Sequence, residues 1–173
     1  MIRPIRPEEC PALMSLLGAV GLFGSDELDF LRGLLESHFQ GQLGDGHTWL
    51  VDADDTGRPV AIAYYAPERL TEGTWNLYLI AVHPDQRRMG RAESLIRHIE
   101  GVLAQTGARL LLVETAFDPL LAGAWALYKK CGYTQEARIA NFYAAGVDKL
   151  IFTKPLATAP LQGRLAGCSP LKS

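Results

Sequence analysis

The feature that most constrains this chain is a change in hydrophobic period after residue 82. The run "TWNLYLIAV" (74–82) is rich in apolar, aromatic and β-branched residues, which predicts a strand. From Met89 to about Gly107 apolar residues recur every three or four positions, which predicts an amphipathic helix. The nearly continuous apolar run "ARLLLVETA" (108–116) then predicts a strand covered on both faces. Strand, helix and strand in this order indicate a parallel, right-handed crossover.

The remaining patterns predict antiparallel elements and further helices around this crossover. Helical spacing with start and stop signals occurs at 7–20, at 25–39 with Ser25 as N-cap, and at 118–133. Strand patterns occur at 1–6, on both sides of the hairpin signal "DDTG" (54–57), and at 133–143 and 149–156. The predicted fold is α/β (α+β mixed sheet): a mostly antiparallel twisted sheet with one parallel crossover, flanked by about four helices.

Composition excludes several classes of protein. The chain has 173 residues, of which 48% are apolar, and this suits one domain over 1–155 followed by a Pro-, Gly-, Ala- and Ser-rich extension at 156–173. A net charge of −2 gives no global attraction to nucleic acid, and no apolar stretch is long enough for a membrane span. Three cysteines without a CxxC pair argue against a disulfide framework and against a zinc site. We therefore expect a cytoplasmic protein that binds no metal, nucleic acid or membrane.

The turn before the central helix concentrates positive charge. Arg87, Arg88 and Arg91 surround Gly90, and the small Ala92 follows. A helix N-terminus presents free amides and the positive end of the helix dipole, so this turn predicts a site for phosphate or diphosphate. Strand-to-helix turns with glycine and solvated arginine are also common without any ligand. Nucleotide phosphate is a further alternative, but the chain lacks the GxxxxGK[ST] motif.

Two motifs resemble those of the GNAT N-acetyltransferase superfamily. "RRMGRA" (87–92) fits the acyl-CoA-binding pattern Q/R-x-x-G-x-G/A, and "AWALYKKCGY" (124–133) fits A-x-x-L-Y-x-x-x-G-F/Y. The resemblance covers most of residues 1–155, and it implies a GNAT-like fold with acetyl-CoA-dependent N-acyltransferase activity. The chain departs from the family at Arg88, where members often have a second glycine, and at Leu121, where many have asparagine.

The resemblance also implies where acetyl-CoA binds. The pantetheine arm is expected along the backbone of the strand that ends at Ile80, Ala81 and Val82. The diphosphate is expected at the turn, on the residues Arg87, Arg88, Met89, Gly90, Arg91 and Ala92. No metal is expected to take part.

The catalytic groups are expected on two other elements. The family commonly uses the tyrosine that matches Tyr128 to protonate the leaving thiolate, although a plain core tyrosine fits the same helical face. Many members place a glutamate on the fourth strand, but "WNLYLIAV" contains no acid. Glu114, which ends an apolar strand, is the best replacement as general base. A structural ion pair for Glu114, and water relayed by backbone carbonyls as the base, are alternatives.

The acceptor site is the least constrained part of the interpretation. The family usually lines it with the loop between the first two helices and with the last hairpin. Aromatic walls and acidic partners for an ammonium group are expected from Phe23, Glu72, Phe142 and Tyr143, with Asp26 and Asp148 as further acids. We expect the acceptor to be the primary amine of a small molecule, and the chain to be a monomer or homodimer. A protein N-terminus or lysine as acceptor, and a non-catalytic acyl-CoA-binding module, are the alternatives.

Overall fold

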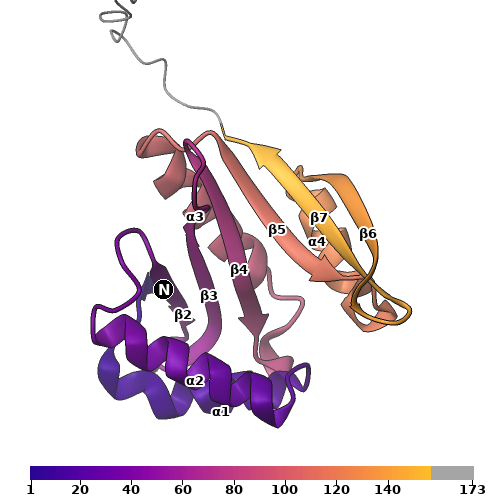
Figure 1. Ribbon diagram of the computed structural model, residues 1–173. Helices are drawn as coiled ribbons and strands as arrows, with labels where there is room; N and C mark the ends of the chain where they lie inside the picture. The colour runs from indigo at the N-terminus through magenta and orange to yellow at the C-terminus, as the bar shows by residue number, and fades with distance from the viewer. Residues whose placement is uncertain (157–173) are drawn as a thin grey trace, which may run out of the picture.

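The computed structural model describes residues 1–156, so the extension predicted at 156–173 lies outside the described residues beyond Leu156. Within that range the strands form a seven-stranded sheet in the order β1-β2-β3-β4-β5-β7-β6 (Figure 1). The strands are β1 (Ile2–Pro4), β2 (Thr48–Ala53), β3 (Pro59–Pro67), β4 (Thr74–Val82), β5 (Leu110–Ala116), β6 (Thr134–Ala144) and β7 (Val147–Pro155). The helices are α1 (Cys10–Val20), α2 (Ser25–Phe39), α3 (Arg91–Gln105) and α4 (Ala122–Lys130). The predicted fold class is confirmed.

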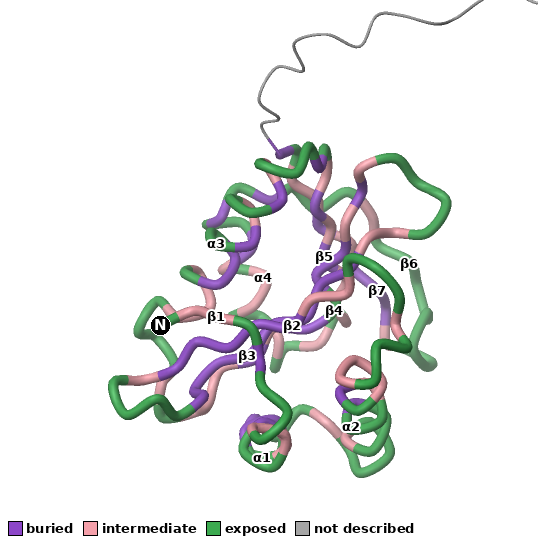
Figure 2. Tube along the Cα trace, turned by 90° about the vertical axis from the view of Figure 1, so that its left-hand side faces the viewer, coloured by how far each residue is buried: buried purple, intermediate pink, exposed green. Residues whose placement is uncertain are grey.

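Helices cover both faces of the sheet, which explains the continuous apolar pattern of its central strands. One core lies under α1 and α2 and includes Leu13, Leu17, Leu35, Val51 and Ile62. The other lies under α3 and α4 and includes Leu95, Ile99, Leu111, Tyr128 and Phe152. Figure 2 shows the buried strands between these two layers and the exposed outer sides of the helices. Burial of each large apolar side chain contributes about 1.5–3 kcal/mol to this packing.

The predicted crossover is present, and its two strands separate. β4 and β5 are parallel, but they pair only along Thr74–Leu77 and Leu110–Val113. Beyond these residues β4 runs on to Val82 and β5 to Ala116, and Figure 1 shows the strands diverging toward their carboxyl ends. The carboxyl ends of parallel strands in such sheets are where ligands bind.

A β-bulge lies where β4 and β5 begin to separate. On β3, Tyr64 and Tyr65 are consecutive, whereas their partners on β4 are Leu79 and Leu77, so Tyr78 is the extra residue. The bulge reverses the alternation of β4: Leu77 packs under α3 and α4, and Leu79 packs under α1 and α2. Tyr78 is left exposed on the α1/α2 side, where its ring stacks on that of Tyr64.

Two local features differ from the expectations. The N-cap of α2 is Gly24 rather than Ser25, because the Gly24 amide donates to Glu27 Oε2 at 2.8 Å. The helix predicted at 118–133 is split into a 3-10 turn at Pro119–Leu121 and α4, since Asp118 caps the turn by accepting from the Leu120 amide. β7 lies between β5 and β6, so the closing hairpin adds to the sheet through its second strand. Among residues 1–156, none of the helices has the length and apolar character that crossing a bilayer requires.

Candidate active site

The backbone at the start of α3 leaves its amides free. Gly90, the N-cap, has a φ of 77°, a left-handed conformation that favours glycine. Arg88 also adopts a left-handed φ, of 61°, so the turn keeps this geometry where family members often have a second glycine. In the described part of the chain, the amides of residues 88–93 donate to no protein acceptor. Free amides and the helix dipole make this turn suitable for an anion.

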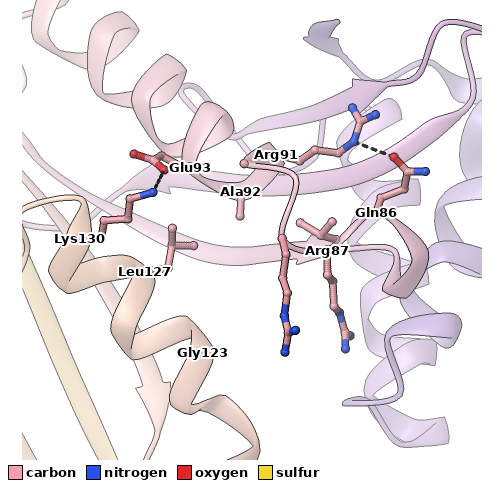
Figure 3. A pocket seen from close by; sticks show the side chains of 11 residues that line it. Gln86, Arg87, Arg91, Ala92, Glu93, Gly123, Leu127 and Lys130 are labelled. Carbon is pink, nitrogen blue, oxygen red and sulfur yellow. Dashed lines mark hydrogen bonds and ion pairs between the residues drawn. The ribbon is translucent and has the colours of Figure 1, made fainter.

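A cavity of about 310 Å³ opens in front of the turn. It lies between the start of α3 and the face of α4 that carries Gly123, Leu127 and Lys130 (Figure 3). A Cβ added to Gly90 would meet no atom within 4 Å, because this residue faces open space in the cavity wall. Free amides and a cavity therefore lie together at the turn, which we call the cradle.

Two of the arginines that line this cavity, Arg87 and Arg91, already have hydrogen-bond partners in the protein. Arg91 donates from Nη1 to Asp52 Oδ2 at 2.8 Å and from Nε to Gln86 Oε1 at 3.0 Å, and it reaches away from Arg87 in Figure 3. Burial alone would raise the pKa of Asp52, but hydrogen bonds from the N-terminal ammonium and Arg91 outweigh it and lower that pKa. Arg91 is one of the residues that line the cavity, and Asp52 of β2 holds its guanidinium; closure of this guanidinium on an anion stays a prediction. Arg87 donates from Nη2 to the Val20 carbonyl at 3.1 Å. The other N–H groups of its guanidinium remain available to an anion.

Lys130 is a further cation of this cavity. Its ammonium lies 2.6 Å from the Glu93 carboxylate, which joins α4 to the first turn of α3 (Figure 3). No motif marks Lys130. The sequence places Lys130 here only through helical spacing, because Lys130 follows Leu127 by three residues and the two therefore share one face of the helix.

A second cavity, of about 490 Å³, fills the space between the diverging ends of β4 and β5. Its walls come from both faces of the sheet: Ala124 and Tyr128 of α4 on one side, and Phe23 of the α1–α2 loop with Tyr143 of β6 on the other. Ile80 lines it directly. Within the described residues, the edge of β4 after Leu77 has no strand partner on this side, so its backbone groups are available to a ligand.

Tyr128 lies in this second cavity with an unpartnered hydroxyl. The residue is 4% exposed, and its ring packs against Tyr133 and Phe152. Burial first, and then the nearby Cys131, raise the pKa of Tyr128 well above its usual value. No hydrogen bond from its hydroxyl is found within residues 1–156, although the group lines the cavity. A tyrosine held here in its protonated form is able to donate a proton to a ligand.

Glu114 lies across the same cavity and is ion-paired. Its carboxylate is 2.6 Å from the ammonium of Lys149 on β7. Leu111 and Val113 pack in the core under α3 and α4, so strand alternation turns Glu114 toward the opposite face. The Lys149 ammonium also lies 4.3 Å from the ring centroid of Phe142, so Phe142 contacts the partner of Glu114, although it is not among the residues that line the second cavity.

A third cavity, of about 630 Å³, adjoins the second on the α1/α2 face of the sheet. The two share Phe23, Glu27, Tyr78 and Leu79. Asp26 lines the third cavity, as expected for an acid near an acceptor. No sequence motif marks Glu27 or Tyr78 as a site residue. Glu27 has the pattern of an ordinary acid in the first turn of α2, and the position of Tyr78 depends on the bulge.

Several expected residues are not brought to these cavities. Glu72 lies in the β3–β4 turn, where its carbonyl accepts from Arg109 Nε at 2.8 Å. Arg69 of the same turn lines the third cavity, whereas Glu72 is not among the residues that line these three cavities. Met89 is 63% exposed and Ala81 is buried under α1 and α2, which leaves only their backbones for a ligand. The Asp148 carboxylate holds the last hairpin, because it accepts from the Asn141 amide at 2.9 Å and from Arg138 at 2.6 Å.

Comparisons with known proteins agree with this geometry. A sequence model described as the acetyltransferase (GNAT) family matches residues 21–133. A GNAT-family structure from Desulfovibrio desulfuricans is 29% identical with a TM-score of 0.84, covering 91% of this chain and 99% of the other. The ribosomal-protein-S18-alanine N-acetyltransferase from Escherichia coli shares the fold at 21% identity and a TM-score of 0.74, with 95% and 99% covered.

An aminoglycoside 6'-N-acetyltransferase complexed with coenzyme A also shares the fold, at 14% identity and a TM-score of 0.74, with 92% of this chain and 99% of the other covered. The comparison with curated proteins found no match. The family match covers more than half of the chain and contains both motifs and the crossover between them. This chain is a member of the acetyltransferase (GNAT) family.

Proposed function

We propose that this acetyltransferase transfers the acetyl group of acetyl-CoA to the primary amine of a small molecule. The observation that carries the proposal is the cavity between β4 and β5, which has walls from both faces of the sheet. The cradle lies on the α3/α4 face, where α4 lines both cavities, and the third cavity adjoins the second on the α1/α2 face. Donor and acceptor therefore have separate approaches to one reaction centre.

The residues of the cradle fit the diphosphate of coenzyme A. The free amides of residues 88–92, the open space at Gly90 and the nearby Arg87 and Lys130 offer donors and positive charge to an anion. The unpaired edge of β4 from Ile80 to Val82 offers hydrogen-bonding groups to the amides of a pantetheine arm. Bound acetyl-CoA supplies the acetyl group as a thioester.

Two side chains of the second cavity take the proton-transfer roles. Glu114, on the side of the acceptor, removes a proton from the substrate ammonium, directly or through one water, and leaves the nitrogen lone pair free to attack. Tyr128, on the side of α4, donates its proton to the departing thiolate. The support for this role is geometric, because Tyr128 lines the cavity and its hydroxyl has no hydrogen-bond partner within residues 1–156; burial raises the pKa of Tyr128 and by itself makes it a weaker acid.

The ion pair of Glu114 with Lys149 leaves one other role open for this carboxylate. Glu114 is a scaffold if its main task is to hold Lys149 and, through it, the last hairpin. Water ordered by backbone carbonyls is then the base. A base and a scaffold differ in the pH dependence of kcat/KM after replacement of Glu114 by Gln.

The test of the proposal is release of free thiol from acetyl-CoA with a panel of primary amines, polyamines, amino acids, aminoglycosides and peptides. We expect turnover with small primary amines. Turnover only with peptides would contradict the proposal in favour of protein acetylation. Binding of acetyl-CoA without thiol release from any acceptor would contradict it in favour of a binding module.

A further inference from the structure

We infer that the acceptor is a primary amine with an extended apolar body and no second positive charge, and that this body lies in the third cavity along α2. The inference rests on the proposed function and specifies its substrate class. It is carried by the shape of the cavity, by its aromatic walls and by the signs of the charges at its two ends.

The cavity follows α2 away from the reaction centre. Glu27 lines both the second and the third cavity, and Phe30, Leu31 and Leu34 continue the wall along the helix. At a rise of about 1.5 Å per residue, Leu34 lies about 10 Å from Glu27 along the helix axis. A volume of about 630 Å³ over this length accommodates an alkyl chain or an arylalkyl group behind an amine at Glu27.

The walls are apolar and include rings without a protein partner. Phe30 is 69% exposed and lines the cavity, so its ring is available to an apolar ligand. Opposite α2, the Tyr64 ring stacks on those of Trp49 and Tyr78, with ring centroids 4.3 and 5.6 Å apart. These stacked rings form an aromatic floor of the cavity. An apolar body laid between Phe30 and this floor would be removed from water on two sides.

The charges at the two ends of the cavity are opposite. At the end shared with the reaction centre, Asp26 and Glu27 are acids that attract an ammonium group. At the other end, His47 accompanies Arg69, and burial first and then the Arg69 charge lower the pKa of His47. His47 is therefore neutral at neutral pH, and its Nδ1 lies 2.6 Å from the Tyr64 hydroxyl.

The charge at this far end of the cavity is therefore the positive charge of Arg69. The neighbouring Glu68 does not line the cavity, because its carboxylate accepts from Asn76, at 3.2 Å, and from the Tyr78 hydroxyl, at 3.3 Å. A second ammonium group, carried at the far end of a diamine or polyamine, would face the Arg69 guanidinium. The methyl end of a monoamine of the same length carries no charge, so the Arg69 guanidinium would not repel it.

The test compares acceptors that differ in one feature. For the series from butylamine to octylamine, we expect kcat/KM to rise by up to about 4-fold per methylene group, as each one is buried. We expect octylamine to exceed 1,8-diaminooctane by at least about 5-fold in kcat/KM. Independence of chain length, or equal use of the diamine, would overturn the inference. Because these amines would still be acetylated, the proposed function would survive; absence of turnover with every amine would refute the proposed function instead.

Two variants test the charged ends. Arg69→Glu should raise kcat/KM for 1,8-diaminooctane by about 5-fold relative to octylamine. Arg58→Glu makes the same charge change before the opposite end of β3, on an exposed turn, and should leave that ratio unchanged. Glu27→Gln keeps an oxygen for the Gly24 amide, so α2 keeps its cap, and should raise KM for octylamine by about 5-fold while kcat changes less. An unchanged ratio in Arg69→Glu, or an unchanged KM in Glu27→Gln, would overturn the placement of the substrate.

Discussion

Replacement of Gly90 by valine should abolish detectable binding of CoA while the fold persists. Gly90 has a φ of 77°, and its missing Cβ faces open space at the cradle. A valine at this position either keeps the left-handed backbone and fills the entrance to the free amides, or relaxes the backbone and turns those amides away. Both outcomes remove the contacts of the diphosphate with the start of α3.

The two effects of this substitution differ in size. A left-handed conformation costs a residue with a Cβ about 1–2 kcal/mol, which is smaller than the free energy of unfolding of a typical domain, about 5–15 kcal/mol. A hydrogen bond to a charged group contributes about 1.5–3 kcal/mol, so loss of two amide contacts to the diphosphate costs about 3–6 kcal/mol. At about 1.4 kcal/mol per factor of ten, the Kd for CoA should rise by at least about 100-fold.

The assay is calorimetric titration of CoA, with circular dichroism as the check on folding. Gly57→Val is a matched control, because Gly57 has a φ of 85°, its Cβ would also meet open space, and it lies in the β2–β3 turn away from the cavities. We expect a comparable loss of stability in both variants and a loss of CoA affinity only in Gly90→Val. An unchanged CoA affinity in Gly90→Val would refute the assignment of the diphosphate to this turn.

Three further predictions concern catalysis and stability. Tyr128→Phe should lower kcat by about 10- to 1000-fold with an unchanged Kd for acetyl-CoA, measured by thiol release and calorimetry; equal turnover would make Tyr128 a core residue only. Glu114→Gln should lose most activity, and its plot of kcat/KM against pH should lose the fall at acidic pH that protonation of the base causes. Lys149→Met should keep this fall. Equal profiles in wild type and Glu114→Gln would make Glu114 a scaffold. Asp52→Asn should lower the free energy of unfolding in urea at pH 7 by about 2 kcal/mol, because it weakens the contacts of this carboxylate with Arg91 and the N-terminal ammonium. Since the pKa of Asp52 is lowered from 3.8 in the fold, its contribution is present above that pH and is lost as the pH falls further; wild type and variant should converge in acid, and a constant difference down to pH 2 would contradict this.

The parts of the fold that follow from local pattern could be predicted from the sequence. The parallel crossover from 74 to 116 depends on a change of period and on apolar strands, which are properties of neighbouring residues. The cradle depends on Gly90 at the start of a helix, and the structure places it there with free amides. Tyr128 follows from its spacing within one helical motif, and it lines the second cavity.

Features that depend on contacts between distant segments could not be predicted in this way. Arg91 and Asp52 are 39 residues apart in the sequence, so nothing near either residue shows that they pair. The bulge at Tyr78 depends on the register of β4 against β3, and it decides that this ring lines the second and third cavities. Glu72 and Arg69 lie in the same turn, but only Arg69 lines the third cavity, which the strand pattern alone does not reveal.

The most direct measurement is product analysis by mass spectrometry after incubation of the protein with acetyl-CoA labelled in the acetyl group and with octylamine. We expect the label on the amine nitrogen of the product, one molecule of free CoA for each molecule of N-acetyloctylamine, and loss of both products in Gly90→Val. Release of CoA without an N-acetylated amine, or binding of acetyl-CoA with no release from any amine tested, would contradict acetyl transfer to a small primary amine.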